Sequence, residues 1–185
     1  MCDTGATDRE DGDGNRVVVG RATMDDVDAV ADLWVELAAG QRAHGSQLRP
    51  ESNRDAALDS AARSAVSGGL FVARLDAGAT DDGAPPAAGG GVVGFVTFGL
   101  ETGRYEREVD RGAVYNLYVR PEYRDDGVGA RLMDRAEAAL ADDGAEAVAL
   151  EAMADNAAAR RFYERRGYEP HRVELEKPIG DDPKR

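Results

Sequence analysis

The sequence predicts an α/β fold in which a mixed sheet has helices packed on both of its faces. Runs rich in β-branched and aromatic residues, such as "RVVVGRA" and "VVGFVTFGL", are typical of strands. Four other stretches repeat apolar residues at the spacing of a helix face. Glycine and proline separate many of these stretches. The resulting order is β-αα-βββ-α-β-α-β, and we expect a single domain over residues 16–185.

The first part of the chain predicts one strand and two helices. The strand covers residues 16–22, and Thr23 with Asp26 forms a capping-box-like start for the helix that follows. The apolar face of this helix consists of Val27, Val30, Ala31, Trp34, Leu37 and Ala38. Residues 40–53 are interpreted as a loop, and a second helix then continues until Gly68.

Three strands are predicted next, at 70–76, 92–100 and 113–119. The first two flank the glycine-rich segment 77–91, so they are expected to form a hairpin. The triple glycine in that segment is not followed by a helix, so we interpret it as a connection and not as a phosphate site.

The last part of the chain alternates helices with strands. A helix begins in the turn 124–130, and a strand at 145–153 and a helix at 155–167 follow it. The apolar face of the first of these helices consists of Val128, Leu132, Ala136 and Leu140. Residues 168–177 are predicted to form a last strand or pair of strands.

The chain is strongly acidic. Lys and Arg total 23 against 36 for Asp and Glu, which gives a formal net charge of −13. The acid is spread along the whole chain, so adaptation of the surface to a salt-rich cytoplasm explains it more simply than a basic partner does. Nucleic-acid binding needs a basic face, so we expect no nucleic-acid partner.

Several features favour a cytoplasmic protein. The chain has no run of about 18 apolar residues, so we expect no membrane span. The segment 1–15 is acidic and glycine-rich, unlike a secretory signal, and is expected to be disordered. Cys2 is the single cysteine, so it cannot form an internal disulfide.

The sequence suggests neither metal nor triad catalysis. His44 and His171 are isolated, and no His, Cys and Asp cluster has the spacing of metal ligands. No Ser/His/Asp or Cys/His arrangement is suggested either. We therefore expect no metal.

The turn "RDDGVGA" at 124–130 is the first candidate site. Gly127 and Gly129 lack the Cβ atoms that would keep a ligand from the backbone. The helix that begins there leaves its first N–H groups unpaired, and Arg124 adds a positive charge. Such a helix start suits a pyrophosphate. The third glycine of a dinucleotide fingerprint is replaced by Leu132, so the turn taken alone is better explained as a helix that merely starts at a glycine.

Two segments together resemble the GNAT superfamily of N-acetyltransferases. "LYVRPEYRDDGVGARLM" at 117–133 is similar to the family's acyl-CoA loop, of the form Arg/Gln-x-x-Gly-x-Gly/Ala. "NAAARRFYERRGY" at 156–168 resembles its Asn…Phe-Tyr…Gly-Tyr/Phe segment. The resemblance implies a mostly antiparallel sheet and transfer of an acetyl group from acetyl-CoA, as cosubstrate, to a primary amine. It also implies that the amine would attack directly in a ternary complex, and a small molecule, a peptide N-terminus and a lysine all remain open as acceptors.

The resemblance also implies which residues bind the cofactor. These are Leu117, Tyr118, Val119, Arg124, Asp125, Asp126, Gly127, Val128, Gly129, Ala130 and Asn156. The strand residues would pair with the pantetheine amides in a slot where two strands splay apart, and the amides of the turn would bind the pyrophosphate. Asn156 would hydrogen-bond the pantetheine arm.

Tyr163 is the implied general acid, because a phenol could protonate the departing thiolate. A packing role for this tyrosine on its helix is the alternative. A carboxylate or a water chain could deprotonate the amine; Glu101, Glu151 and Asp155 are candidates, but in so acidic a chain surface solvation explains each of them better, and none is singled out. A non-catalytic acyl-CoA-binding module on the same fold and, from the glycines alone, a nucleotide-binding regulator are the other functions considered. A homodimer also remains open.

Asp125 and Asp126 depart from the family's turn, which often carries glycine or a basic residue there. Asp126 suits an N-cap position, where its carboxylate would favour the start of the helix. We expect both side chains to point outward while the backbone faces the cofactor. Because salt screens exposed like charges, acetyl-CoA binding should hold or tighten as KCl rises.

Overall fold

The computed structural model describes residues 17–75, 91–102, 108–177 and 179. The chain divides into two compact units, Met1–Glu151 and Ala152–Arg185. The acidic segment 1–15 and nearly all of the connection 77–91 lie outside the described residues.

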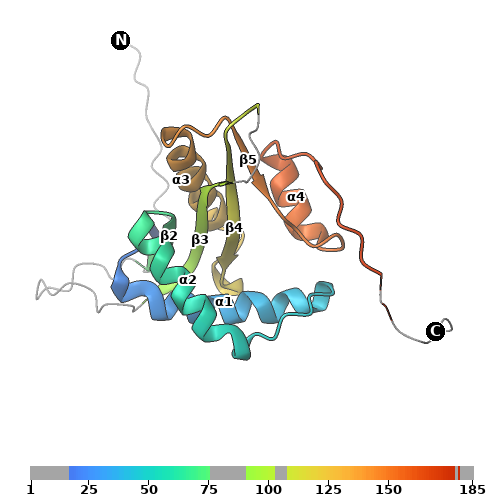
Figure 1. Ribbon diagram of the computed structural model, residues 1–185. Coiled ribbons are helices and arrows are strands. Elements are labelled where there is room, and N and C mark those ends of the chain that lie inside the picture. Colours follow the sequence, from blue (N-terminus) through green and yellow to red (C-terminus); the bar gives the residue numbers. More distant parts are fainter. Residues whose placement is uncertain (1–16, 76–90, 103–107, 178, 180–185) are drawn as a thin grey trace, which may run out of the picture. The chain divides into compact units, whose positions relative to one another are not determined.

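The first unit is built on a five-stranded sheet with the strand order β1-β2-β3-β4-β5 (Figure 1). The strands are β1 (Val17–Arg21), β2 (Leu70–Leu75), β3 (Val92–Leu100), β4 (Arg111–Val119) and β5 (Ala147–Leu150). The first three neighbouring pairs are antiparallel, and β4 with β5 is parallel. The predicted mixed and mostly antiparallel sheet is confirmed, as is the hairpin of β2 and β3.

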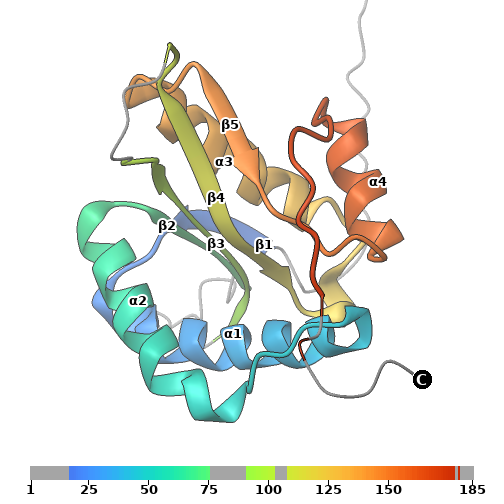
Figure 2. The same cartoon turned by 45° about the vertical axis from the view of Figure 1, so that its right-hand side comes forward.

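Three helices of this unit cover the two faces of the sheet (Figure 2). They are α1 (Val27–Gln41), α2 (Arg54–Ser67) and α3 (Val128–Asp142). Side chains of α1 and α2 form a core with one strand face, including Leu33, Val72 and Phe95. Side chains alternate along a strand, so Phe71 points to the other face, where Arg135 of α3 lies over its ring at 5.3 Å. The expected helices on both faces are confirmed.

Local signals explain where these helices begin and end. The Thr23 N–H donates to Asp26 Oδ2 over 2.7 Å, which confirms the predicted capping box at the short 3₁₀ turn Met24–Asp26 before α1. Gly68 ends α2 with a φ of +78°. The predicted loop 40–53 is partly helical, because α1 continues to Gln41 and two short 3₁₀ turns follow.

The second unit contains α4 (Ala157–Arg165). Asn156 caps this helix, because its Oδ1 accepts a hydrogen bond from the Ala159 N–H over 3.0 Å. Tyr163 makes edge-to-face contacts with Phe162 and Tyr168, at ring-centre distances of 5.2 and 5.8 Å. The helix predicted at 155–167 is therefore present, with narrower bounds of Ala157–Arg165.

The prediction of a last strand at 168–177 is wrong. Residues 168–177 form no strand, and Val173 and Leu175 are 80% and 89% exposed. Alternation of apolar and charged residues produced that prediction, yet a strand also needs a neighbour to satisfy its backbone groups. Pro170 removes one donor at the start of the segment. The strand predicted at 145–153 is likewise shorter, spanning Ala147–Leu150.

Candidate active site

The parallel pair of β4 and β5 comes apart halfway along β4. Their pairing ends at Val114 opposite Leu150, whereas β4 continues to Val119. Among the described residues, the stretch 115–119 has no partner strand on the β5 side. This is the splayed edge that the family resemblance implies. Apart from the Val119 carbonyl, which accepts a hydrogen bond from Arg124, the N–H and C=O groups on this side can receive another extended chain, as any sheet edge can.

A β-bulge lies where the two strands separate. The register of β3 and β4 shifts between Thr97 and Phe98, which pair with Asn116 and Val114, so Tyr115 has no counterpart. Asn116 Nδ2 donates to Thr97 Oγ1 over 2.8 Å and fixes the residue after the bulge. The sequence contained no glycine or proline at this point, so the bulge could not be predicted.

The turn after β4 leads into α3 with an unusual backbone. Asp125 and Gly127 both have left-handed conformations, with φ of +65° and +72°. The helix begins at Val128, and the Arg131 N–H donates to the Gly127 carbonyl over 3.0 Å. The amides of residues 128–130 precede this bond, so they have no acceptor within the helix. They form the kind of helix start that binds an anion.

Arg124 joins the turn to the strand. Its Nε donates to the Val119 carbonyl over 2.8 Å, and its guanidinium carbon lies 5.6 Å from the Tyr118 ring centre. The side chain predicted to add positive charge to the turn therefore also holds the strand end. A carbonyl bond at Nε leaves the Nη atoms of the guanidinium for a further acceptor.

The two aspartates of the turn are solvent-exposed, as an outward orientation requires. The predicted N-cap role of Asp126 is wrong, because Gly127 is the N-cap residue of α3. The left-handed glycine places the helix start one residue later than the acidic side chain suggested.

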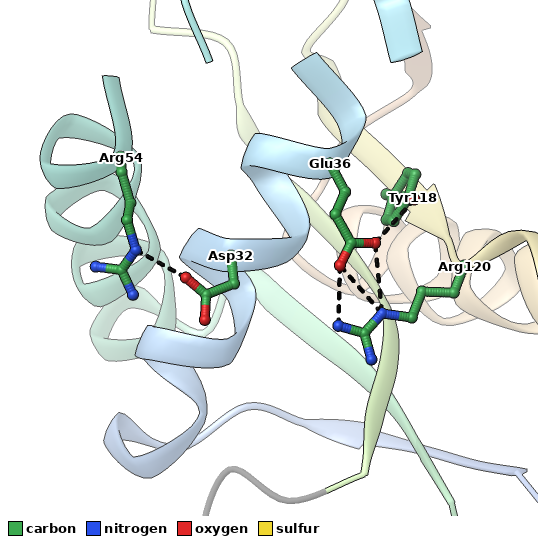
Figure 3. A network of polar contacts seen from close by, with 5 residues as sticks. All are labelled: Asp32, Glu36, Arg54, Tyr118 and Arg120. Carbon is green, nitrogen blue, oxygen red and sulfur yellow. Dashed lines mark hydrogen bonds and ion pairs between the residues drawn. The ribbon is translucent and has the colours of Figure 1, made fainter. Parts of the chain in front are cut away.

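Glu36 of α1 and Arg120 after β4 are polar residues that our sequence reasoning missed (Figure 3). The Tyr118 hydroxyl donates to Glu36 Oε2 over 3.0 Å, and Arg120 Nη2 lies 2.9 Å from Glu36 Oε1. Burial and the Glu36 carboxylate raise the pKa of Tyr118. A signal did exist, because Asp28, Asp32 and Glu36 recur every four residues along the helix.

Tyr163 and Asn156 belong to the second unit, and their roles stay predictions. Burial raises the pKa of the Tyr163 hydroxyl, so the phenol keeps its proton at neutral pH. The Oδ1 of Asn156 is used in capping α4, which leaves its Nδ2 for the pantetheine arm.

The carboxylates considered as bases differ in their surroundings. Glu101 forms a two-point pair with Arg111, with distances of 3.0 and 2.8 Å, which disfavours a role in proton transfer. Glu151 and Asp155 both lie after the end of β5. Within the part of the chain that the structure describes, no group of His, Cys, Asp and Glu could hold a metal ion.

Comparison with known proteins supports the fold and the family. Residues 34–168 match the model of the acetyltransferase (GNAT) family. A GCN5-related N-acetyltransferase from Ralstonia eutropha has 24% sequence identity and a TM-score of 0.63, covering 90% of this chain and 99% of its own. The aminoglycoside N-acetyltransferase AAC(6')-Iy, solved with CoA, has 15% identity and a TM-score of 0.65, covering 90% and 97%.

A Trypanosoma brucei acetyltransferase is similar as well, with 16% identity and a TM-score of 0.59 over 89% of this chain and 100% of its own. At these identities the solved structures support the fold alone. No curated protein matches the chain in sequence. No helix among the described residues is long and apolar enough to cross a membrane.

Proposed function

Because the chain belongs to the GNAT family of acetyltransferases, we propose that it transfers an acetyl group from acetyl-CoA to a primary amine by direct attack in a ternary complex. The observation that carries this proposal is the unpaired edge of β4 at 115–119, which leads directly into the anion-binding start of α3. One surface suits the amides of pantetheine, and the other suits a pyrophosphate.

The cofactor would lie along these two surfaces in order. The backbone of residues 117–119 would pair with the pantetheine amides, and the amides of residues 128–130 would bind the pyrophosphate with help from the Nη atoms of Arg124. A backbone N–H on the unpaired β4 edge would polarise the thioester carbonyl and stabilise the oxyanion that forms there. Asn156 would donate from Nδ2 to the pantetheine arm.

The proposed chemistry balances without any further reactant. The neutral amine nitrogen attacks the thioester carbonyl carbon, and the resulting tetrahedral intermediate loses the thiolate of CoA as its C–S bond breaks. Tyr163 donates its proton to that thiolate. The amine, with an ordinary pKa of about 10.4, first loses one proton to a carboxylate or to water so that it can attack. Its nitrogen loses a second proton as the amide forms, and this proton returns through water to the Tyr163 phenolate, so the enzyme is restored.

The acceptor is proposed only as a primary amine, on a small molecule, a peptide N-terminus or a lysine. We further propose that the protein acts in a salt-rich cytoplasm, does not use nucleic acid as a partner and needs no metal. Its acidic chain, with a net charge of −13, supports the first two of these points. A homodimer is compatible with the proposal.

The test is release of free thiol from acetyl-CoA in the presence of a panel of amines, at low and multimolar KCl. Amine-dependent release is the expected result. The second candidate function is a non-catalytic acyl-CoA-binding module, which would retain the turn and the β4 edge but would not need Tyr163. Binding of CoA without release for any amine would favour this module, and absence of CoA binding would overturn both.

A further inference from the structure

Helix α1 carries a row of carboxylates that is divided between two arginines (Figure 3). Arg54 of α2 pairs with Asp28 and Asp32, at 3.3 and 2.7 Å. Arg120, which follows β4, pairs with Glu36 at 2.9 Å. One turn of α1 therefore separates a contact with the neighbouring helix from a contact with the end of the splayed strand.

The Glu36 carboxylate binds the side chains of the two residues that flank Val119, the last residue of β4. It accepts from the Tyr118 hydroxyl at 3.0 Å and from Arg120 Nε and Nη2 at 3.3 and 2.9 Å. These two donors flank Val119 in the chain. Tyr118 is 9% exposed, so its hydroxyl bond lies largely out of water, where such a bond is stronger.

The same strand end is held from the turn. Arg124 donates to the Val119 carbonyl and lies over the Tyr118 ring. The Arg120 N–H donates to the Val93 carbonyl over 2.9 Å, and the Arg120 carbonyl accepts from the Tyr123 N–H over 3.0 Å. A continuous series of contacts therefore runs from Glu36 through Tyr118 and Arg120 to the turn that opens α3.

We propose that Glu36 is a positioning residue for the cofactor: by fixing Tyr118 and Arg120, it sets the spacing between the unpaired β4 edge and the helix start that binds the pyrophosphate. This inference rests on the proposed function, because it assigns Glu36 to the same acyl-CoA site. Glu36 touches neither surface directly, and its effect passes through the strand end.

Removing Glu36 has two effects of opposite sign on CoA binding. The strand end loses its anchor, which weakens binding. Arg120 also loses its paired carboxylate and keeps the nearby charge of Glu122, so the strand end becomes more positive, which strengthens binding of anionic CoA. Salt separates the two effects, because at about 2 M KCl the Debye length is a few ångströms and the charge effect on partly exposed groups fades. The loss of the anchor persists at high salt.

The experiment is titration of the purified full chain with CoA by calorimetry, at about 0.15 M and about 2 M KCl. Glu36→Ala removes both bonds. Glu36→Gln keeps one acceptor for the Tyr118 hydroxyl, and Tyr118→Phe removes only that hydroxyl. At high salt we expect Glu36→Ala to weaken CoA binding about 3- to 30-fold, with smaller losses in the other two variants.

Asp32→Asn is the matched control. It makes the same change of charge one turn earlier on α1 and removes the 2.7 Å pair with Arg54. We expect thermal stability to fall slightly in this variant, with CoA affinity unchanged. In steady-state assays, Glu36→Gln should raise KM for acetyl-CoA while kcat changes by less than about twofold, a division that general loss of stability would not produce.

Two results would overturn the inference alone: CoA binds the folded Glu36 and Tyr118 variants as tightly as the parent at high salt, or Asp32→Asn weakens binding as much as Glu36→Ala. If Glu36→Ala does not fold, Tyr118→Phe decides the matter, since it keeps the buried ring. If the parent itself binds no CoA, the proposed function fails, and the inference fails with it.

Discussion

The Arg124 side chain bridges two neighbouring parts of the site: its Nε donates to the Val119 carbonyl over 2.8 Å while its own backbone stands at the entrance to the turn. The distance between the unpaired end of β4 and the start of α3 is therefore fixed by this contact. A ligand that pairs with the strand and also reaches the helix start depends on that spacing, because a displacement of about 1 Å can cost a hundredfold in rate.

Replacing Arg124 should weaken CoA binding. Arg124→Ala removes both the carbonyl bond and a cation beside the expected phosphates, so we expect the dissociation constant measured by calorimetry to rise about tenfold. Arg124→Lys retains the charge but loses the planar fork and the Nε bond, and should recover only part of the affinity.

Arg131→Ala provides the control for this prediction. Arg131 also uses a guanidinium to bind a strand carbonyl, that of Val17 over 2.8 Å, but on the distant strand β1. Its removal should lower thermal stability and leave CoA affinity within about twofold. Equal losses of affinity in the two alanine variants would mean that Arg124 acts through stability alone.

Gly127→Ala tests whether the left-handed turn serves the ligand. A Cβ at this position would meet no atom within 4 Å, so the cost comes from the φ of +72°, about 1–2 kcal/mol. Gly144, which follows α3, has a φ of +95° and equally open space around its Cβ. Gly144→Ala should therefore destabilise the protein to a similar extent.

The two glycine variants should differ in ligand binding. Only Gly127→Ala adds a methyl group and strain beside the amides of residues 128–130, so we expect CoA affinity to fall several-fold in this variant and to stay unchanged in Gly144→Ala. Melting temperatures by calorimetry, with and without CoA, measure both effects. Similar shifts by CoA in the two variants would place the cofactor elsewhere.

Local patterns predicted most of the sheet, because each strand has its own β-branched run and each helix its own apolar face. They failed where the answer depends on a neighbour. The alternation that includes Val173 and Leu175 cannot reveal that residues 168–177 pair with no strand. Asp126 has the right chemistry for an N-cap, yet the left-handed Gly127 takes that position.

The site, too, contains parts that the sequence could predict and parts that it could not. Glycines and the helix that follows them are a local signal, so the turn could be predicted. The contact between Glu36 and Arg120 joins residues that are 84 positions apart, and the bulge at Tyr115 depends on the register with β3. The four-residue recurrence of Asp28, Asp32 and Glu36 marks a row of carboxylates, but neither the pairing of Glu36 with Arg120 nor the bulge can be found within a short window, because both arise from packing of distant elements.

Tyr163→Phe should lower kcat by about 10²–10⁴-fold if the phenol is the general acid, with CoA affinity unchanged. Burial raises the pKa of Tyr163 above its ordinary value of about 10, so loss of the proton should limit the parent enzyme only at still higher pH. Below that pH the phenol is protonated in both the folded and the unfolded chain. The alkaline decline of kcat should disappear in the variant.

Tyr168→Phe is the matched control, since it removes the same oxygen from a ring that contacts Tyr163 at 5.8 Å. We expect its kcat to stay within about threefold of the parent, because this hydroxyl is not the proposed proton donor. Turnover that is unchanged in Tyr163→Phe would remove Tyr163 from the mechanism and leave it as a packing aromatic.

The exposed aspartates predict how salt acts on the cofactor. The side chains of Asp125 and Asp126 are exposed and would repel the phosphates of CoA in dilute buffer, whereas at about 1 M salt the Debye length falls to about 3 Å. CoA binding to the parent should therefore hold or tighten as KCl rises. The double variant Asp125→Asn, Asp126→Asn should bind about two- to fivefold more tightly at low salt and like the parent at high salt.

The other end of α3 supplies the control, where Asp142 and Asp143 are also adjacent and exposed. Changing both to Asn alters the net charge equally but not the charge beside the turn, so CoA affinity should stay unchanged at either salt concentration. Calorimetric titrations across the KCl series measure all three proteins. If salt instead weakens CoA binding to the parent steeply, attraction between side-chain cations and phosphate governs the site. The backbone amides would then not be the main phosphate-binding groups.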